Sequence, residues 1–235
     1  MLPQAILFDM DDTLLFVNVT ADSAWKEACN LAVKEPKPHS TEEFLNQLNT
    51  VRNWYWSDAE RHRVGRLDLH GARTAIVRMA LEKLGCNDEQ TANNIAANYA
   101  NILDGALEFF PNAENTLKEL VKKRVKLALL TNGAGEAQQA KIKRFKLGRY
   151  FSICLIEGEL GYGKPDQRFF KMALDKLGVM PNQAWMVGDD LERDITGAQA
   201  AEIFSVWYDF REAGLPASST VKPDRIINNL AELLK

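Results

Sequence analysis

Two aspartates, two residues apart, follow a short apolar run near the start of the chain. The segment Phe8–Thr13 reads FDMDDT, with acidic side chains at Asp9 and Asp11. In extended chain these side chains point to the same side, about 6.6 Å apart along the strand. Carboxylates that converge in this way repel each other unless a cation lies between them, and Mg²⁺ is the usual cation beside phosphate. The pair indicates a metal-dependent site, with a solvated aspartate-rich turn as the alternative.

A second acidic cluster follows another apolar run and reads GDD-x-x-x-D. It comprises Gly188, Asp189, Asp190 and Asp194. Gly188 allows a tight turn at the end of the predicted strand. Asp194 falls near the start of the next predicted helix, where acidic residues also serve as ordinary N-terminal charges. An ordinary helix-terminal charge is a stronger alternative for Asp194 than for Asp189.

Two further polar segments complete the set. Thr131 and Asn132 follow a third apolar run, and their hydroxyl and backbone N–H groups suit phosphate oxygens, with simple N-capping as the alternative. The segment GELGYGKP places Lys164 where a nucleotide-binding P-loop has its lysine. A P-loop continues with Ser or Thr, and here the next residue is Pro165, which a first helical turn accommodates easily. We therefore expect Lys164 to serve other chemistry than nucleotide binding.

The elements that position these residues alternate between buried strands and amphipathic helices. The apolar runs are QAILFDMD, VKLALLTNG, SICLIEGELG, AWMVGDD and the weaker IFSVWY. Helical spacing is found at 113–124, 135–146, 166–178 and 192–201. Such alternation predicts an α/β fold with a doubly wound parallel sheet, in which ligands bind beyond the carboxyl ends of the strands. The polar clusters stand at those ends.

Residues 18–102 have a different character. They show helical periodicity and no convincing strand, so we expect an inserted all-helical domain there, with a core domain at 1–17 and 103–235. KEPKPHS separates the first two helices, with Ser40 or Thr41 as N-cap, and GCND separates the last two, with Asn87 or Asp88 as N-cap.

The overall charge and composition of the chain argue against some classes of binding partner. The chain has 235 residues and a net charge of −3, so no global positive field draws in nucleic acid or an acidic membrane. Three widely spaced cysteines form neither a disulfide framework nor a metal motif. Neither a signal-peptide core nor a membrane-length apolar run is present. We expect a cytoplasmic protein, either a monomer or a homodimer.

Taken together, the four polar clusters resemble the haloacid dehalogenase superfamily of phosphohydrolases. Their order is D-x-D-x-T, then a hydrophobic strand with Thr-Asn, then Lys-Pro, then G-D-D-x-x-x-D. The resemblance covers residues 1–17 and 106–235, and 18–102 falls where members with a helical cap carry that domain. It implies a Rossmann-like core and a Mg²⁺-dependent phosphatase acting on a small phosphorylated metabolite.

The resemblance also implies roles for the first acidic pair. Asp9 is expected to be the nucleophile that forms a phosphoaspartate. Asp11 is expected to protonate the leaving alcohol and then to deprotonate the attacking water. The carboxylates of Asp9 and Asp189 and the backbone carbonyl of Asp11 are expected to hold Mg²⁺.

The other motif residues take supporting roles in the same scheme. Thr131 and the Asn132 amide would hold phosphate oxygens, and Lys164 would neutralise charge on the phosphate and on Asp9. Asp194 would orient Lys164 or a metal-bound water. Of the neighbouring residues, Asp12 and Asp190 are expected to be turn residues and Thr13 a local hydrogen-bonding partner of the backbone.

The helical cap is expected to exclude water and to select the leaving group. Arg61 and Arg66 are candidates for binding an anionic substrate, and Trp54 or Tyr55 for stacking on a ring. The alternatives are a solvated face for the arginines and cap core for the aromatic residues.

Three rival functions remain at this point. A phosphomutase of the same superfamily shares every core residue. A dehalogenase is disfavoured because its chemistry needs neither a metal nor an acid/base at Asp11. A phospho-acceptor signalling module is disfavoured by the large helical insertion. Gln139, Lys141 and GELGYGKPD resemble the branch with N-acylneuraminate-9-phosphatases, pyrimidine nucleotide phosphatases and phosphoglycolate phosphatases, and the sequence does not choose among them.

Overall fold

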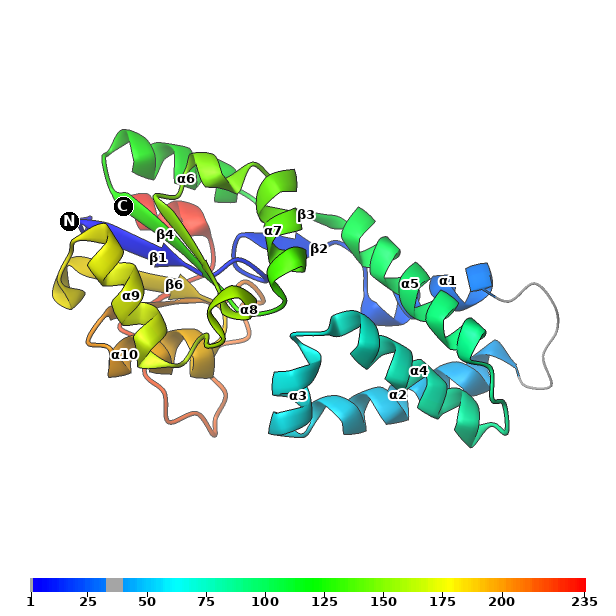
Figure 1. The fold of residues 1–235 in the computed structure, drawn as a ribbon. Helices are drawn as coiled ribbons and strands as arrows, with labels where there is room; N and C mark the ends of the chain where they lie inside the picture. The colour runs from blue at the N-terminus through cyan, green and yellow to red at the C-terminus, as the bar shows by residue number, and fades with distance from the viewer. Residues whose placement is uncertain (1, 33–39) are drawn as a thin grey trace. The chain divides into compact units, whose positions relative to one another are not determined.

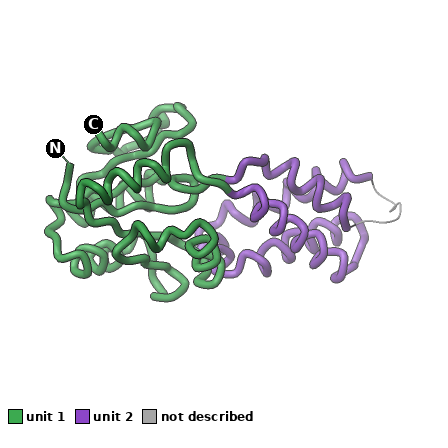
Figure 2. The backbone as a smooth tube through the Cα atoms, turned by 90° about the horizontal axis from the view of Figure 1, so that it is seen from above, with its two compact units in different colours: residues 1–16, 108–235 green, residues 17–107 purple. Residues whose placement is uncertain are grey.

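The computed structural model describes residues 2–32 and 40–235, and the chain divides into two compact units (Figure 2). The first unit contains Met1–Phe16 and Glu108–Lys235, and the second contains Val17–Leu107. A short two-stranded sheet, β2 (Leu15–Val17) with β3 (Leu107–Phe109), is formed where the chain passes between the units. KEPKPHS, predicted to be a helix break, lies outside the described residues except for its last residue.

The first unit is built on a six-stranded sheet in which every neighbouring pair is parallel. The order is β5-β4-β1-β6-β7-β8. The strands are β1 (Ala5–Phe8), β4 (Lys126–Thr131), β5 (Ile153–Ile156), β6 (Ala184–Gly188), β7 (Phe204–Tyr208) and β8 (Arg225–Ile227). The predicted α/β class with a doubly wound parallel sheet is confirmed. The sequence did not reveal β8, which has only three residues.

Both faces of the sheet are covered, which explains why its strands are continuous apolar runs rather than alternating ones. Ile6, Leu7 and Phe8 are all fully buried. Leu7 packs in a cluster with Phe169 and Phe170 of α9 (Gln167–Leu177). Figure 1 shows α9 and α10 (Gly197–Ala200) on one side of the sheet and α6 (Ala113–Lys122) on the other. Helices on both faces hold the strand ends in fixed positions.

The remaining helices of this unit are short. They are α7 (Gly135–Arg144), α8 (Glu157–Leu160), the 3₁₀ turns η1 (Leu147–Arg149), η2 (Pro181–Gln183) and η4 (Leu230–Leu234), and η3 (Leu191–Thr196), a π-helical turn. The helix predicted at 192–201 is thus a π turn followed by α10. Aspartate 190 caps η3 by accepting hydrogen bonds from the backbone N–H groups of Glu192 and Arg193, as expected of a turn residue.

The second unit consists of five helices in the described residues. They are α1 (Ala21–Ala32), α2 (Thr41–Trp56), α3 (Ala59–Gly65), α4 (Leu69–Lys83) and α5 (Glu89–Gly105). Their apolar faces form a separate core, in which Trp25 stacks on Tyr99 with ring centroids 3.7 Å apart. Ser40 caps α2 in a capping box with Glu43, and Asp88 caps α5, as the sequence indicated.

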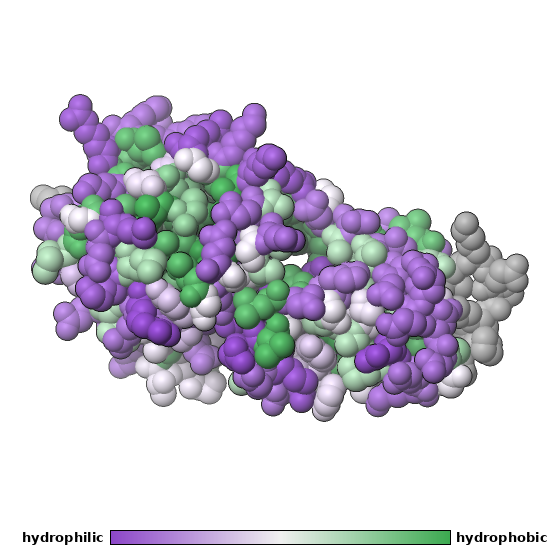
Figure 3. All heavy atoms as spheres, in the orientation of Figure 1, coloured by the Kyte–Doolittle hydropathy of each residue, from purple (hydrophilic) through white to green (hydrophobic). Residues whose placement is uncertain are grey.

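The face of the molecule drawn in Figure 3 carries mainly hydrophilic residues, with small hydrophobic areas scattered among them. Such scattering is normal for a folded domain. In the part of the chain that the structure describes, no helix is long and apolar enough to cross a membrane.

The register of the three central strands brings the predicted site residues to one edge of the sheet. Phe8 pairs with Leu129 of β4 and with Val187 of β6. Asp9 and Gly188 are the next residues along their strands and Thr131 ends β4 two residues beyond Leu129, so all three lie at the carboxyl end of the sheet. Parallel pairing thus brings together residues that lie more than 100 positions apart in the sequence.

Gly188 ends β6, with two residues between it and the start of η3, and a side chain there would meet Asp194. A Cβ built at Gly188 lies 2.2 Å from Oδ2 of Asp194 and 2.6 Å from its Cβ, so the whole Asp194 side chain would have to move. We predict that Gly188→Ala destabilises the protein by about 1–3 kcal/mol, as expected of overpacking.

Gly148→Ala is the matched control, because a Cβ at Gly148 meets nothing within 4 Å. Denaturant unfolding followed by circular dichroism measures both variants. Equal stability of the two would contradict the close approach of Gly188 to Asp194.

Candidate active site at the carboxyl end of the sheet

Asp9 begins the loop after β1 and is buried there. Its backbone N–H donates to the carbonyl of Val187 at 2.9 Å, which continues the sheet pairing by one residue. Its side chain is paired with the ammonium of Lys164. Lys164 Nζ also lies 2.7 Å from Oδ1 of Asp194. All three side chains are at least nine-tenths buried, so each charge depends on its partners for compensation.

Lys164 is held in place through its backbone as well as through its side chain. The side-chain amide of Asn132 donates to the Lys164 carbonyl at 2.7 Å, and its Oδ1 accepts from the Lys164 N–H at 2.8 Å. Gly163 allows this approach, because a Cβ there would lie 2.5 Å from Asn132 Oδ1. The side chain of Asn132 therefore fixes the lysine that the sequence singled out.

The geometry of GELGYGKP is that of a loop that delivers Lys164 to Asp9, not that of a phosphate-binding loop before a helix. Its first residues lie in the short helix α8, and α9 begins only at Gln167 with Asp166 as N-cap. Pro165 thus lies one residue before the N-cap, just outside the helix predicted at 166–178. Asp166 is the better N-cap because its side chain accepts the backbone N–H of Arg168.

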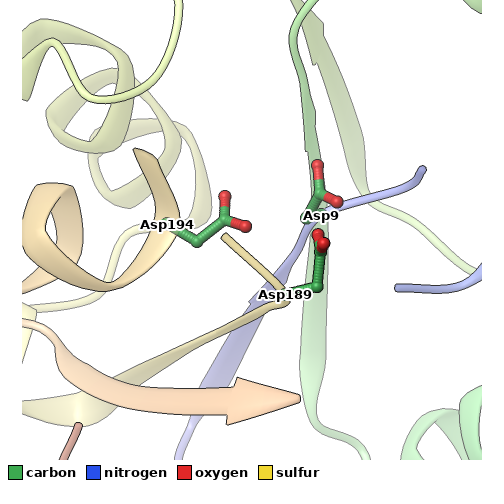
Figure 4. A group of neighbouring side chains, drawn as sticks. All are labelled: Asp9, Asp189 and Asp194. Carbon is green, nitrogen blue, oxygen red and sulfur yellow. The ribbon is translucent and has the colours of Figure 1, made fainter. Parts of the chain in front are cut away.

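Three carboxylates form a group that can hold a metal ion: Asp9, Asp189 and Asp194 each offer an oxygen, and these atoms lie within 4.8 Å of one another (Figure 4). Asp189 follows β6, and its backbone carbonyl accepts the indole N–H of Trp207 at 2.7 Å. Three carboxylates against the single ammonium of Lys164 leave two negative charges, which one divalent cation balances. Hard oxygen donors in this number suit Mg²⁺.

The protonation behaviour of the group reflects this excess of negative charge. Burial raises the pKa of Asp9 to about 7, although Lys164 acts in the opposite direction. Burial, with the charges of Asp9 and Asp194, raises the pKa of Asp189 to about 8. Burial by itself lowers the pKa of Lys164, but the charges of Asp194 and Asp9 prevail and the pKa is raised. Lys164 therefore stays cationic here, and Asp9 and Asp189 keep their protons to higher pH than free aspartates do.

Asp11 is held by two residues of α7. Lys141 Nζ lies 2.7 Å from Asp11 Oδ1, and Gln138 Nε2 donates to Asp11 Oδ2 at 2.8 Å. The same amide nitrogen lies 2.6 Å from the hydroxyl oxygen of Thr131. Sequence reasoning noted Lys141 only as a family feature and missed Gln138. The signal available for both was their spacing of one helical turn on a helix that starts just after the strand end.

The neighbours of the first acidic pair are less directly involved. Asp12 is exposed and has a positive φ of 60°, as expected for a turn residue. Thr13 is fully buried, and its hydroxyl makes no hydrogen bond within the described residues, so the expected local bond is wrong. The backbone N–H groups of Leu14 and Leu15 instead both donate to the carbonyl of Met10.

The two arginines predicted to contact substrate lie in the second unit. Arg61 donates to the carbonyls of Tyr55 at 3.1 Å and Trp54 at 2.7 Å, and its guanidinium lies 4.0 Å from the centroid of the Trp54 ring. These contacts brace the turn between α2 and α3. Arg66 follows α3, and its backbone N–H donates to the carbonyls of His62 and Val64. Substrate binding by either arginine remains a prediction.

Comparison with known proteins identifies the family of the chain. The family model of haloacid dehalogenase-like hydrolases matches residues 3–202. The chain therefore belongs to the haloacid dehalogenase-like hydrolase family, an enzyme family, as the motifs suggested.

Three similar proteins illustrate the relationship. A phosphoserine phosphatase from Thermus thermophilus is 38% identical over 162 residues, covering 68% of this chain and 63% of that protein. A glyceraldehyde 3-phosphate phosphatase from Pyrococcus furiosus is 30% identical over 99% of this chain and 92% of its own length. A magnesium-bound HAD hydrolase from Bacillus subtilis has the same fold, with a TM-score of 0.72, 19% identity, and coverage of 99% of this chain and 97% of its own.

The raised carboxylate pKa values predict how the stability of the metal-free protein varies with pH. Asp9 and Asp189 titrate near 7 and 8 in the folded state but near 3.8 when unfolded, so the folded state binds more protons between these limits. The contribution of these two carboxyls to stability therefore falls as pH rises from about 4 to 8, and between pH 6 and 8 they should dominate the change. The melting temperature should drop by about 2–4 °C for each kcal/mol lost, and Mg²⁺ should restore it most at pH 8.

Asp189→Asn provides the comparison. Without that carboxylate the metal-free protein should show a flatter pH profile and a smaller melting-temperature response to Mg²⁺. Differential scanning calorimetry in chelator and in Mg²⁺ measures both. A melting temperature of wild type that rises between pH 6 and 8 in chelator would show that the sign is wrong.

Proposed function

We propose that this protein is a Mg²⁺-dependent phosphatase that hydrolyses a small phosphorylated metabolite through a phosphoaspartate on Asp9. The observation that supports this most directly is the environment of Asp9. It is a buried carboxylate at the carboxyl end of the central strand, paired with Lys164 and within 4.8 Å of oxygens of Asp189 and Asp194. A carboxylate nucleophile attacking a phosphate dianion needs positive charge beside it, which Lys164 supplies in part and a divalent cation held by these oxygens would complete.

The donor set fits a magnesium ion. Asp9 and Asp189 would hold it through their carboxylates and Asp11 through its backbone carbonyl. Asp194 belongs to the same group of oxygens, but its ion pair with Lys164 suits it better to orienting the lysine. When bound, Mg²⁺ would supply the charge neutralisation that lets Asp9 approach the phosphate.

Nucleophilic attack, proton transfer and phosphate binding are carried out by residues of the chain. Asp9 attacks phosphorus and the bond to the leaving oxygen breaks, while Asp11 gives that oxygen a proton. Asp11 then takes a proton from the water that attacks the phosphoaspartate, which restores both aspartates. The Thr131 hydroxyl and the Asn132 backbone N–H hold phosphate oxygens. Lys164 offsets the charge shared by the phosphate and Asp9.

The substrate class follows from the relatives rather than from the site. The two phosphatases described above act, by their names, on phosphoserine and on glyceraldehyde 3-phosphate. Both are small phosphorylated metabolites, and a compound of that class is the substrate proposed here. Residues 18–102 would select the leaving group, with Arg61 and Arg66 as candidate contacts for a second anionic group.

Replacement of the proposed nucleophile tests the function. Asp9→Asn should abolish Mg²⁺-dependent hydrolysis of an aryl phosphate, because an amide is a poor nucleophile and a weaker metal ligand. Release of nitrophenol from a nitrophenyl phosphate, with and without chelator, measures the loss. Asp12→Asn is the matched control, since Asp12 is exposed and asparagine tolerates its positive φ. Equal turnover by Asp9→Asn and wild type would refute the proposal.

Asp11 distinguishes the phosphatase from its rivals. Asp11→Asn should keep Mg²⁺ binding, because the proposed metal contact is through the backbone, but lose turnover by at least ~10²-fold. With a good leaving group the first step needs little protonation, so phosphoenzyme should accumulate. Rapid-quench measurement with a labelled aryl phosphate detects it. Normal turnover would favour a dehalogenase-type site, and wild-type transfer of the phosphoryl group to a sugar would favour a phosphomutase.

A further inference from the structure

Two residues of α7 reach across the site to the carboxylate of Asp11, and the proposed mechanism does not yet use them. Gln138 and Lys141 are three positions apart, so they lie on the same face of the helix. Lys141 contacts Oδ1 of Asp11 and Gln138 contacts Oδ2, across 130 and 127 residues of sequence. Each carboxylate oxygen therefore has its own donor.

Gln138 is buried and contacts both Asp11 and Thr131. Its side chain is shielded from solvent, with only 3% of the residue exposed. Its Nε2 lies within hydrogen-bond distance of Asp11 Oδ2 at 2.8 Å, Thr131 Oγ1 at 2.6 Å and the Asn132 carbonyl at 2.9 Å. One amide group thus fixes Asp11 relative to the strand end that carries Thr131.

Asp11 needs such support because its side chain is only partly enclosed by the protein. Its side chain is 39% exposed, in contrast to the buried Asp9 beside it. Proton transfer requires the acid to lie about 2.6–3.2 Å from the leaving oxygen, and small misplacements in such geometry are costly to rate. A carboxylate oxygen has two lone-pair sites, so the contacts from α7 leave room for a proton.

We propose that Gln138 and Lys141 are positioning residues that hold the Asp11 carboxylate in place for proton transfer to the leaving group. This rests on the proposed phosphatase function. The reaction itself is unchanged: the proton leaves Asp11 for the leaving oxygen as the phosphorus–oxygen bond breaks, and a proton returns to Asp11 from the attacking water. Neither Gln138 nor Lys141 gains or loses a proton.

The distinguishing consequence is a dependence on the leaving group. When Asp11 is poorly placed, the first step should slow down for phosphate esters with poor leaving groups. Esters whose leaving group needs little protonation should react at nearly the normal rate. For Lys141→Met, the first-step rate with an alkyl phosphate should fall by roughly tenfold or more, and that with a nitrophenyl phosphate by less than about threefold. KM should stay nearly constant, and Lys141→Arg should recover most of the rate with the alkyl ester.

The experiment is a rapid-quench, single-turnover measurement on the full chain with Mg²⁺ and a series of labelled alkyl and aryl phosphates. Lys143→Met is the matched control, because Lys143 lies on the same helix and is exposed. Gln138→Met is a second variant, with the same expected dependence on the leaving group. If the buried Gln138 variant fails to fold, the partly exposed Lys141 carries the test alone.

The possible results separate cleanly. A steeper dependence on the leaving group in Lys141→Met, absent in Lys143→Met, supports the inference. An equal loss for every substrate, or a raised KM with kcat unchanged, overturns it, the latter in favour of direct substrate binding by Lys141. Wild-type protein without phosphatase activity would overturn the proposed function itself, whereas an active wild type with an unaffected Lys141→Met removes only the positioning role.

Discussion

The site depends on one buried cation. The ammonium of Lys164 lies between the carboxylates of Asp9 and Asp194, and none of the three side chains is more than 9% exposed. Removing charges from water costs several kcal/mol for each ion unless partners compensate, and here each ion is compensated by another. If Lys164 were lost, two buried carboxylates would face each other without a counter-ion. The positions of β1, of the loop before α9 and of η3 therefore all depend on this one group.

The surrounding contacts keep that cation and its partners from relaxing. The side chain of Asn132 hydrogen-bonds to the backbone N–H and carbonyl of Lys164, and the indole N–H of Trp207 donates to the carbonyl of Asp189. Gly188 has no side chain, and the side chain of Asp194 occupies the space where its Cβ would lie. Each contact comes from a different strand end of the sheet. A site braced in this way does not need to reorganise as charge develops during a reaction, which is the main source of electrostatic catalysis.

Charge is distributed unevenly across the site. Asp11 is matched by Lys141 and Asp190 by Arg193, so these pairs are balanced within the protein. The group of Asp9, Asp189 and Asp194 is not balanced, because Lys164 supplies one positive charge against three negative ones. Burial raises the pKa values of Asp9 and Asp189, and the neighbouring negative charges add to the shift. A divalent cation and a phosphate group are the kinds of partner that such a centre would bind together.

The sequence predicted the longer strands of the sheet but not the three-residue strands. Five strands were found because each is an apolar run long enough to be buried on both faces. The strands β2, β3 and β8 were not predicted, because a run of three residues shows no measurable hydrophobic periodicity. The helix predicted at 166–178 corresponds to α9, which begins one residue later because Asp166 is its N-cap.

The types of residue at the strand ends could be read from the amino-acid order alone. Asp9, Thr131 and Asp189 follow apolar runs, and in a parallel sheet such ends must meet at one edge. The side chains that support them became known only from the folded molecule. Gln138 and Lys141 reach Asp11, and Asn132 reaches the backbone of Lys164, through the register of neighbouring strands and the rotation of α7 about its axis. Those are properties of the packed molecule, because contacts between segments up to 130 residues apart leave no local pattern in the chain.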